Sequence, residues 1–391
     1  MRKSRTLQSK SGLNKFLLIL LVIPLFQGCG LSGAYIYFGD KNWSQYLSSL
    51  DSGQKEAPQD FLKAAYGNYK DSLTYDEKRY PEVYVKLADT EYLLTNRPNK
   101  SIGWCKKGLS VLPEHDAITA ALGKYTFYYA RDEKDPNILN EAKDHYRKAL
   151  IASPLNSEYN AGLMKVYFYE IETNRFEARE SRNKYLMSEV SELMENVVGD
   201  ESAAVEEARG IFAYIKRDYK TAIEKLTAVL QASNEEFDNR KTQFYLARSY
   251  VETKRYNDAI ELTNLLAEKY PEDIHFRGER CLAYFLRGDK SAGRIELDYM
   301  EKNAPEYHEF FYRVGKYFYS QSEAKKAKLY LLKAYRTDGE NGNYAFALGE
   351  TYLLEGNSPA ARKFFSKAKQ AAPVKSDLEK KAQQRITEIG N

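Results

Sequence analysis

The sequence predicts an all-α solenoid built from stacked pairs of helices. The first observation is a period of 34 residues in the last third of the chain, where Pro271, Pro305 and Pro373 lie 34 or twice 34 residues apart and Gly339 occupies the slot between them. The second is that small and apolar residues within each period recur at the spacing of one helix face. Because a single helix pair cannot bury its apolar side alone, neighbouring pairs must stack on it.

The period that ends at Pro373 shows how one pair is built. Two sets of residues mark its facing sides, Leu348, Gly349 and Tyr352 in a first helix, and Ala361, Phe365 and Ala368 in a second. The small residues let the helices approach closely, and the aromatic rings fill the gap to the next pair. In the turn between them, Ser358 is suited to cap the second helix and Pro359 to occupy its first position.

Earlier periods keep the same pattern with decreasing regularity. Units begin at Arg240 and Ile274, and the next carries Val314-Gly315, Ala327 and Ala334 at the expected offsets. Upstream, residues 60–239 predict irregular helix pairs, of which residues 160–197 depart most because the small residues are missing. We expect about seven or eight pairs in all. Residues 374–391 are polar and helical in character, which predicts a C-terminal capping helix.

This pattern of small, aromatic and proline positions resembles the tetratricopeptide repeat (TPR) family, most clearly over residues 240–373. The resemblance implies a right-handed superhelix of helix-turn-helix repeats. It also implies a scaffold or adaptor that binds other proteins or extended peptide segments, rather than an enzyme, and it requires no cofactor.

In the TPR family the concave groove is lined mainly by positions 2, 5, 9, 12 and 13 of each first helix. Carried onto the four regular units, the resemblance selects a peptide-binding groove formed by Lys241, Phe244, Arg248, Phe285, Tyr312, Lys316, Tyr319, Phe346 and Glu350. An aromatic and cationic strip suits an extended peptide or an acidic helix. The alternative is that these residues merely cover the inner face. The lysine-asparagine carboxylate clamp of chaperone-binding TPR domains is missing, so a Glu-Val-Asp tail is not indicated.

The first 28 residues predict a signal peptide that is cleaved. Residues 1–15 carry five Lys or Arg and no acid, and residues 16–26 are apolar without a break. This run is short for a membrane span and has the length of a signal-peptide core. The alternatives are an uncleaved anchor or an ordinary signal peptide, and both also direct the remaining chain out of the cytoplasm.

The residues that follow, Gln27-Gly28-Cys29-Gly30, resemble the lipobox of bacterial lipoproteins. The resemblance implies that Cys29 becomes the acylated N-terminus, with a linker over residues 29–59, and that two or three acyl chains anchor the protein to the membrane. Gly30 is not the aspartate that retains many such lipoproteins at the inner membrane. We therefore expect the periplasmic side of the outer membrane.

Removal of the signal peptide on export would change the net charge of the protein. The formal net charge of +4 includes the five cations of the leader, so the chain from Cys29 carries about −1. A nucleic-acid partner therefore loses its main support, and none is expected.

The sequence contains no recognisable catalytic or metal-binding motif. The four histidines, His115, His145, His275 and His308, are scattered over different units and never paired at metal-ligand spacing. Cys105 and Cys281 fall at small packing positions of distant units, which predicts two buried free thiols rather than a disulfide.

Two alternatives to a scaffold remain open. An envelope enzyme would place its site between the irregular units from Tyr84 to Val197, in a deep polar pocket with convergent acids or histidines. A surface-exposed adhesin would use Arg287-Gly288-Asp289, which falls in a turn between two helices.

Overall fold

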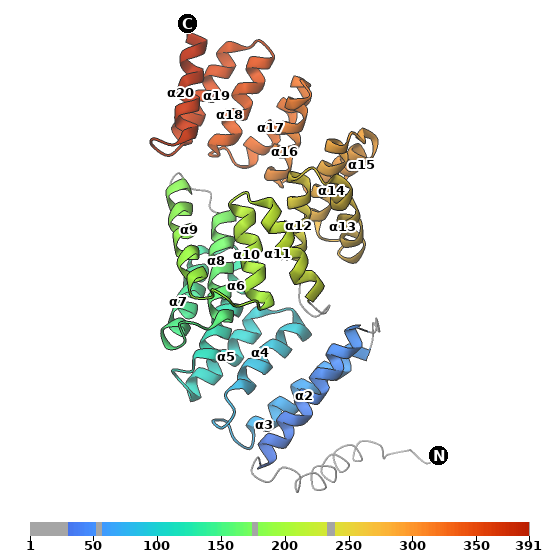
Figure 1. Cartoon of the computed structure of the whole chain (residues 1–391), viewed down its shortest axis with the longest axis vertical. Helices are drawn as coiled ribbons and strands as arrows, with labels where there is room; N and C mark the ends of the chain where they lie inside the picture. Colours follow the sequence, from blue (N-terminus) through green and yellow to red (C-terminus); the bar gives the residue numbers. More distant parts are fainter. Residues whose placement is uncertain (1–29, 52–56, 174–178, 233–238, 391) are drawn as a thin grey trace, which may run out of the picture. The chain divides into compact units, whose positions relative to one another are not determined.

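The computed structural model describes residues 30–51, 57–173, 179–232 and 239–390, and these residues form nineteen helices and no strand (Figure 1). The predicted all-α class is confirmed. Cys29 and the predicted signal peptide lie outside the described residues. Within the described ranges, no helix combines the length and the apolar character that crossing a membrane requires.

The chain divides into two compact units. Unit 1 comprises residues 1–166, 196–200 and 233–237, and unit 2 comprises residues 167–195, 201–232 and 238–391. The helices of unit 1 are α2 (Gly30–Asp51), α3 (Ala57–Leu73), α4 (Glu82–Thr95), α5 (Pro98–Val111), α6 (Asp116–Glu133), α7 (Pro136–Ala152) and the first part of α8 (Ser157–Thr173).

The predicted linker over residues 29–59 is wrong for most of its length, because residues 30–51 form helix α2. Ala34 and Ile36 of this helix are buried, and the chain passes so close to α3 that a Cβ added at Gly39 would lie 2.4 Å from the ring of Tyr69. Asp40 accepts a hydrogen bond from the Tyr69 hydroxyl at 2.8 Å. The N-terminal helix is therefore part of the folded array.

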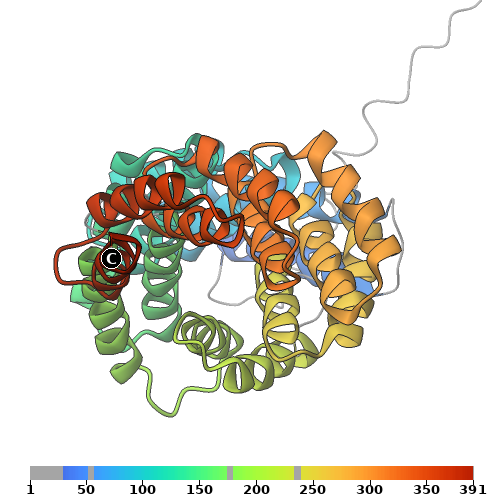
Figure 2. The same ribbon diagram turned by 90° about the horizontal axis from the view of Figure 1, so that it is seen from above.

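Unit 2 contains the end of α8 and twelve further helices. They are α9 (Arg179–Glu195), α10 (Ala203–Ile215), α11 (Tyr219–Ala232), α12 (Arg240–Glu252), α13 (Tyr256–Lys269), α14 (Ile274–Arg287), α15 (Lys290–Asn303), α16 (His308–Ser320), α17 (Ala324–Thr337), α18 (Gly342–Leu354), α19 (Ser358–Ala371) and α20 (Asp377–Gly390). The first helices of four successive pairs begin at residues 240, 274, 308 and 342, each 34 residues after the last. In Figure 2 the pairs from α12 to α20 follow one another along an arc within this unit.

The turns inside these four pairs share one backbone conformation. Lys254, Gly288, Ser322 and Gly356 all have positive φ, between 58° and 99°, and they too lie 34 residues apart. A left-handed residue after a helix lets the following N–H groups bond to the last free carbonyls. The N–H of Asn357, for example, donates to the carbonyl of Tyr352 at 2.8 Å.

Side-chain caps fix where the second helices begin. Asp135 caps α7 by accepting a hydrogen bond from the N–H of Asn137 at 2.7 Å, with Pro136 in the first turn as expected. The cap of α19 is one residue earlier than predicted. The side chain of Asn357, not Ser358, accepts from the N–H of Ala360 at 3.1 Å, because the turn needs its left-handed residue at Gly356.

Close contact between the two helices of a pair holds the core together. Phe365 of α19 is fully buried against Gly349 of α18, where an added Cβ would lie 2.6 Å from the ring. Ala361 and Ala368 on the same stripe are also fully buried. The last helix, α20, buries Ala382 beside Ala345 and Ala368, so it covers the apolar end of the array.

The cysteines behave as small core residues. Cys105 and Cys281 are both free and fully buried, as expected. Burial raises the pKa of the Cys105 thiol to about 12. The thiol of Cys281 donates to the carbonyl of Gly293 at 3.3 Å. Both thiols therefore stay protonated and unreactive in the folded chain.

Removing the ring of Phe365 tests the helix-pair contact. Phe365→Ala should lower the free energy of unfolding by about 3–5 kcal/mol, because it leaves a cavity that Gly349 cannot fill. Urea unfolding followed by circular dichroism measures the change. Ile295→Ala is the control, since Ile295 is 70% exposed and its loss should change stability by less than about 0.5 kcal/mol. Equal effects of the two substitutions would contradict the packing described.

Candidate functional site

The side of unit 2 formed by the first helices α10, α12, α14, α16 and α18 is the candidate site, and we call it the inner face. One side chain on this face contacts two other first helices. Arg248 of α12 donates to Glu279 of α14 at 2.8 Å and also reaches Glu309 of α16, two pairs further along the chain. Side chains from alternate first helices therefore meet on this face.

A buried network of charges occupies the centre of the inner face. Glu279 is only 1% exposed and accepts hydrogen bonds from both Arg248 and Arg313. Arg313 also lies 3.4 Å from Glu252 at the end of α12. Removing Glu279 would leave the guanidinium groups of Arg248 and Arg313 without the buried carboxylate that they share, which is far more costly than an exposed ion pair is worth. The network therefore fixes the relative positions of three first helices.

The charges of the network depend on one another. Burial raises the pKa of the Glu309 carboxyl, but the positive charges of Arg248 and Arg313 outweigh this and hold it below its usual range. The second oxygen of Glu279 and the hydroxyl of Tyr245 are buried and have no hydrogen-bond partner among the described residues. A water molecule or a polar group of a ligand would satisfy each of them.

Aromatic rings extend along the inner face beside the network. The ring of His275 contacts Phe244 at 5.6 Å and Tyr307 at 4.9 Å between centroids. Further along, Tyr312 packs on Tyr344 at 4.6 Å. These edge-on and tilted contacts are the geometries that aromatic pairs favour. Of these rings Phe244, Tyr307 and Tyr312 are half-buried, His275 is exposed and Tyr344 is buried.

Several members of the predicted groove are committed to contacts within the protein. Arg248 is 7% exposed and belongs to the charge network. Phe285 is 4% exposed and stacks on Tyr317 in the core, so it does not line an open surface. This placement corrects the assignment from the family positions. Phe285 points to the second helix, where Gly293 leaves room for its ring.

Other members lie at the edges of the inner face. Lys241 is exposed and pairs with Glu172 at the end of α8 at 2.5 Å. Glu350 accepts from Arg385 of α20 at 2.7 Å, so the capping helix holds it. The half-buried ring of Phe346 lies against Phe365. Tyr319 is half-buried, and its hydroxyl lies 3.4 Å from Glu350.

Tyr312 and Lys316 are predicted groove residues that lie beside each other, the first half-buried and the second exposed. They stand one helical turn apart on α16, with the Lys316 ammonium 5.6 Å from the centre of the Tyr312 ring. Lys316 is exposed and forms no ion pair with any described residue. Burial raises the pKa of Tyr312, and the positive charge of Arg217 opposes this rise. We call Tyr312 and Lys316, together with the buried ring of Tyr344 that packs against Tyr312, the tyrosine platform.

The sequence did not single out the residues at the centre of the charge network. Glu279 and Arg313 occupy the same position of successive units, 34 residues apart, and Tyr245 precedes them by another 34. Equivalent positions of stacked units face each other. The 34-residue spacing of Glu279 and Arg313 could therefore have predicted their ion pair. The positions taken from the family did not include this one.

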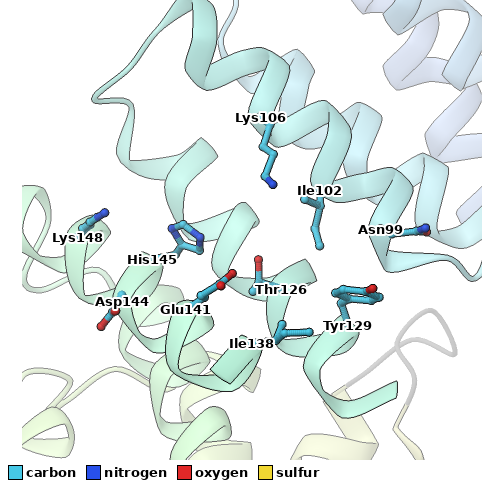
Figure 3. Close-up of a pocket in the computed structure, with 10 residues that line it drawn as sticks. All are labelled: Asn99, Ile102, Lys106, Thr126, Tyr129, Ile138, Glu141, Asp144, His145 and Lys148. Carbon is cyan, nitrogen blue, oxygen red and sulfur yellow. The ribbon is translucent and has the colours of Figure 1, made fainter. Parts of the chain in front are cut away.

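A second candidate site is a cleft in unit 1, in the region where an enzyme site was considered. It has a volume of about 570 Å³ and lies between α5, α6 and α7. Figure 3 shows its lining, which consists of Asn99, Ile102, Lys106, Thr126, Tyr129, Ile138, Glu141, Asp144, His145 and Lys148. Burial, followed by the charge of Lys148, lowers the pKa of His145. The imidazole is therefore neutral at pH 7.

The cleft lacks the convergence that catalysis needs. Glu141, Asp144 and His145 all come from α7, and both carboxylates are exposed to solvent. Asp144 lies 3.6 Å from Arg147 on the same helix. Within the described ranges, no group of three histidine, cysteine or acidic side chains could hold a metal ion. The lining of the cleft is a mixture of apolar and charged side chains.

The tripeptide considered for adhesion has a structural role. Gly288 supplies the left-handed residue after α14, and Asp289 caps α15 by accepting from the N–H of Ala292 at 3.4 Å. Arg287 lies 3.1 Å from Asp289. The two charged side chains are therefore bound to each other and to the turn.

Comparison with known proteins agrees with this architecture. The family model of the tetratricopeptide repeat matches residues 213–278, from α10 into α14. These residues therefore form tetratricopeptide repeats, and repeats of this kind imply a scaffold for protein-protein interaction. No curated protein matches the chain.

Several solved structures are similar to parts of the chain. A thermophilic TPR protein of Thermus thermophilus is 21% identical, with a TM-score of 0.40, over 48% of this chain and 100% of its own. A TPR protein of Parabacteroides merdae is 13% identical, with a TM-score of 0.48, over 69% and 99%. A human IFIT1 dimer with PPP-AAAA is 15% identical, with a TM-score of 0.48, over 82% and 87%.

Acid should weaken unit 2 through Glu309. Its pKa is lower in the folded chain than in the unfolded chain, so the unfolded state binds more protons as the pH falls. The stability it supplies is complete above about pH 4.3 and is lost as the pH falls through its folded pKa. Urea midpoints from pH 7 to pH 3 should show Glu309→Gln less stable than the wild type at neutral pH and nearly equal to it in acid.

The control is Glu340→Gln, which removes an exposed carboxylate that has no ion pair with any described residue. Its stability should follow that of the wild type at every pH. A constant difference between Glu309→Gln and the wild type from pH 7 to pH 3 would show that the carboxylate contributes no charge interaction.

Proposed function

We propose that this protein is a membrane-anchored TPR lipoprotein that acts as a non-enzymatic scaffold or adaptor in the bacterial cell envelope. It binds other proteins or extended peptide segments through the inner face of unit 2. The acylated Cys29 holds it at the membrane, on the periplasmic side of the outer membrane. The observation that carries the proposal is the tyrosine platform, in which the half-buried ring of Tyr312 lies beside an exposed lysine that forms no ion pair with any described residue.

The chemistry of the platform suits an extended acidic segment. Tyr312 and Tyr344 already pack on each other, so little rotamer freedom remains to be lost when a partner binds. Lys316 supplies a positive charge, and Arg217 acts electrostatically on Tyr312. Because the charge network neutralises Arg248 and Arg313, selectivity for a negative partner comes from Lys316 and not from the centre of the face.

A photo-crosslinking residue at Tyr312, installed in the native organism, should capture one dominant envelope protein. Lys316→Glu in the same chain should reduce the capture at least tenfold, because reversing this charge repels an acidic segment. Mass spectrometry of the captured species identifies the partner and its crosslinked peptide.

The matched control places the crosslinker at Ile295, an exposed position on the second-helix side of the same unit. It should capture little of that partner. If both positions capture the same proteins equally, or if Lys316→Glu changes nothing, the platform is not the binding surface.

The anchor is proposed from the sequence alone, and the basic leader, the apolar run and the residues around Cys29 support it. Cys29→Ser should move the protein from the membrane fraction into the fraction released by alkaline washing. Mass spectrometry of the wild-type N-terminus should show an acylated cysteine. A wild-type chain that is unmodified at Cys29, or a variant that stays with the membrane, would remove the lipoprotein part of the proposal.

A further inference from the structure

The outer face of the last two regular pairs carries an unbalanced positive charge. Helices α17 and α19 hold nine Lys or Arg and no acid. The corresponding helices before them are different, since α13 has three acids and one cation and α15 has three of each. A surface that needed only solubility would mix both signs, as α15 does.

Part of this charge is used within the fold. Lys326 pairs with Glu323, Lys328 with Glu355 and Lys333 with Glu301. Lys367 donates to the Tyr335 hydroxyl at 3.1 Å. The remaining five cations are exposed and form no ion pair within the described part of the chain, and we call them the cationic face: Lys325, Arg336, Arg362, Lys363 and Lys369.

The five cations are divided between the neighbouring helices α17 and α19. Lys325, Leu329 and Arg336 stand at i, i+4 and i+11, so they share one side of α17. Arg362 and Lys369 stand at i and i+7 on α19. The two helices lie side by side, because the ring of Tyr335 on α17 contacts Phe364 on α19 at 5.6 Å between centroids. Like charges at this spacing repel one another until an anionic surface neutralises them.

We propose that the cationic face lies against the anionic headgroups of a phospholipid bilayer. Three of its five members are lysines, hydrated point charges that suit a diffuse anionic surface more than a paired carboxylate. Leu329, between these charges, is 50% exposed and can enter the headgroup layer. The exposed large side chains of α17 and α19 include no aromatic ring on which a nucleobase could stack.

The geometry also disfavours an acidic peptide at this site. The charges spread across two second helices on the outer side of unit 2, whereas the half-buried aromatic rings lie on the inner face. A broad planar partner contacts both helices at once. This proposal rests on the proposed function in one respect, that the chain is held at a membrane. It adds that unit 2 contacts that membrane through its outer side, which leaves the inner face free for a partner.

The test uses the full chain reconstituted in vesicles, with a polarity-sensitive fluorescent amino acid in place of Gln370. Gln370 is exposed on α19, next to Lys369. Its emission should shift to the blue in vesicles that contain phosphatidylglycerol but not in vesicles of phosphatidylcholine alone. Molar salt should abolish the shift by screening the charges.

The triple variant Arg362→Gln, Lys363→Gln and Lys369→Gln should lose the blue shift. The equilibrium constant for binding of the cationic face to the bilayer should fall about fivefold for each cation removed. The matched control removes three exposed cations elsewhere in unit 2, Lys220→Gln, Lys269→Gln and Lys302→Gln, and should keep the shift. Exposed substitutions of this kind leave the fold intact.

An equal shift in both kinds of vesicle, or an equal loss in both variants, would overturn the proposal. So would a response to an oligonucleotide or an acidic polypeptide with none to the anionic vesicles. Recovery of the chain with the vesicles reports the anchor separately, so failure of the cationic face and failure of the lipoprotein proposal can be told apart.

Discussion

The close approach of the two helices in each pair is the constraint on which the rest of the structure depends. Gly349 meets the ring of Phe365, and Gly315 meets Leu331 at the same position one unit earlier. A Cβ at either glycine would lie 2.6 Å from the opposing side chain. Since each pair is thin and apolar on both sides, its neighbours must cover it, and the polar helix α20 covers the apolar side of the last pair.

The close stacking of the pairs determines which part of the inner face is accessible. Alternate first helices come close enough for Arg248 to reach across one unit to Glu309, and an uncompensated charge there would be costly. Glu279 lies between Arg248 and Arg313 and compensates both positive charges. It thereby links α12, α14 and α16. The centre of the face is consequently occupied by the protein itself. The proposed partner would bind beside the network, where the ring of Tyr312 is half-buried and Lys316 is exposed.

The sequence predicted the regular half of the array well because one interaction repeats there. Small residues and rings at fixed offsets report the helix-pair contact directly, and the observed helices begin every 34 residues. Helix α2 was missed because its packing residues, such as Ala34 and Gly39, meet α3 without that repeat. The groove was predicted less well, since its residues came from family positions that describe the backbone. The side chain of Phe285 instead follows the space left by Gly293, which only the packed structure shows.

The two faces of unit 2 differ because packing constrains them differently. On the inner face every charge near the centre has a partner, since burial makes an unpaired charge expensive. On the outer face solvent screens the charges, so folding sets almost no limit on their sign. Even so, α17 and α19 carry cations alone, while α13 carries mainly acids. A distribution that stability does not require, and that self-repulsion opposes, is explained by a partner of opposite charge. We therefore propose the outer surface of the last two pairs as a second binding surface beside the inner face.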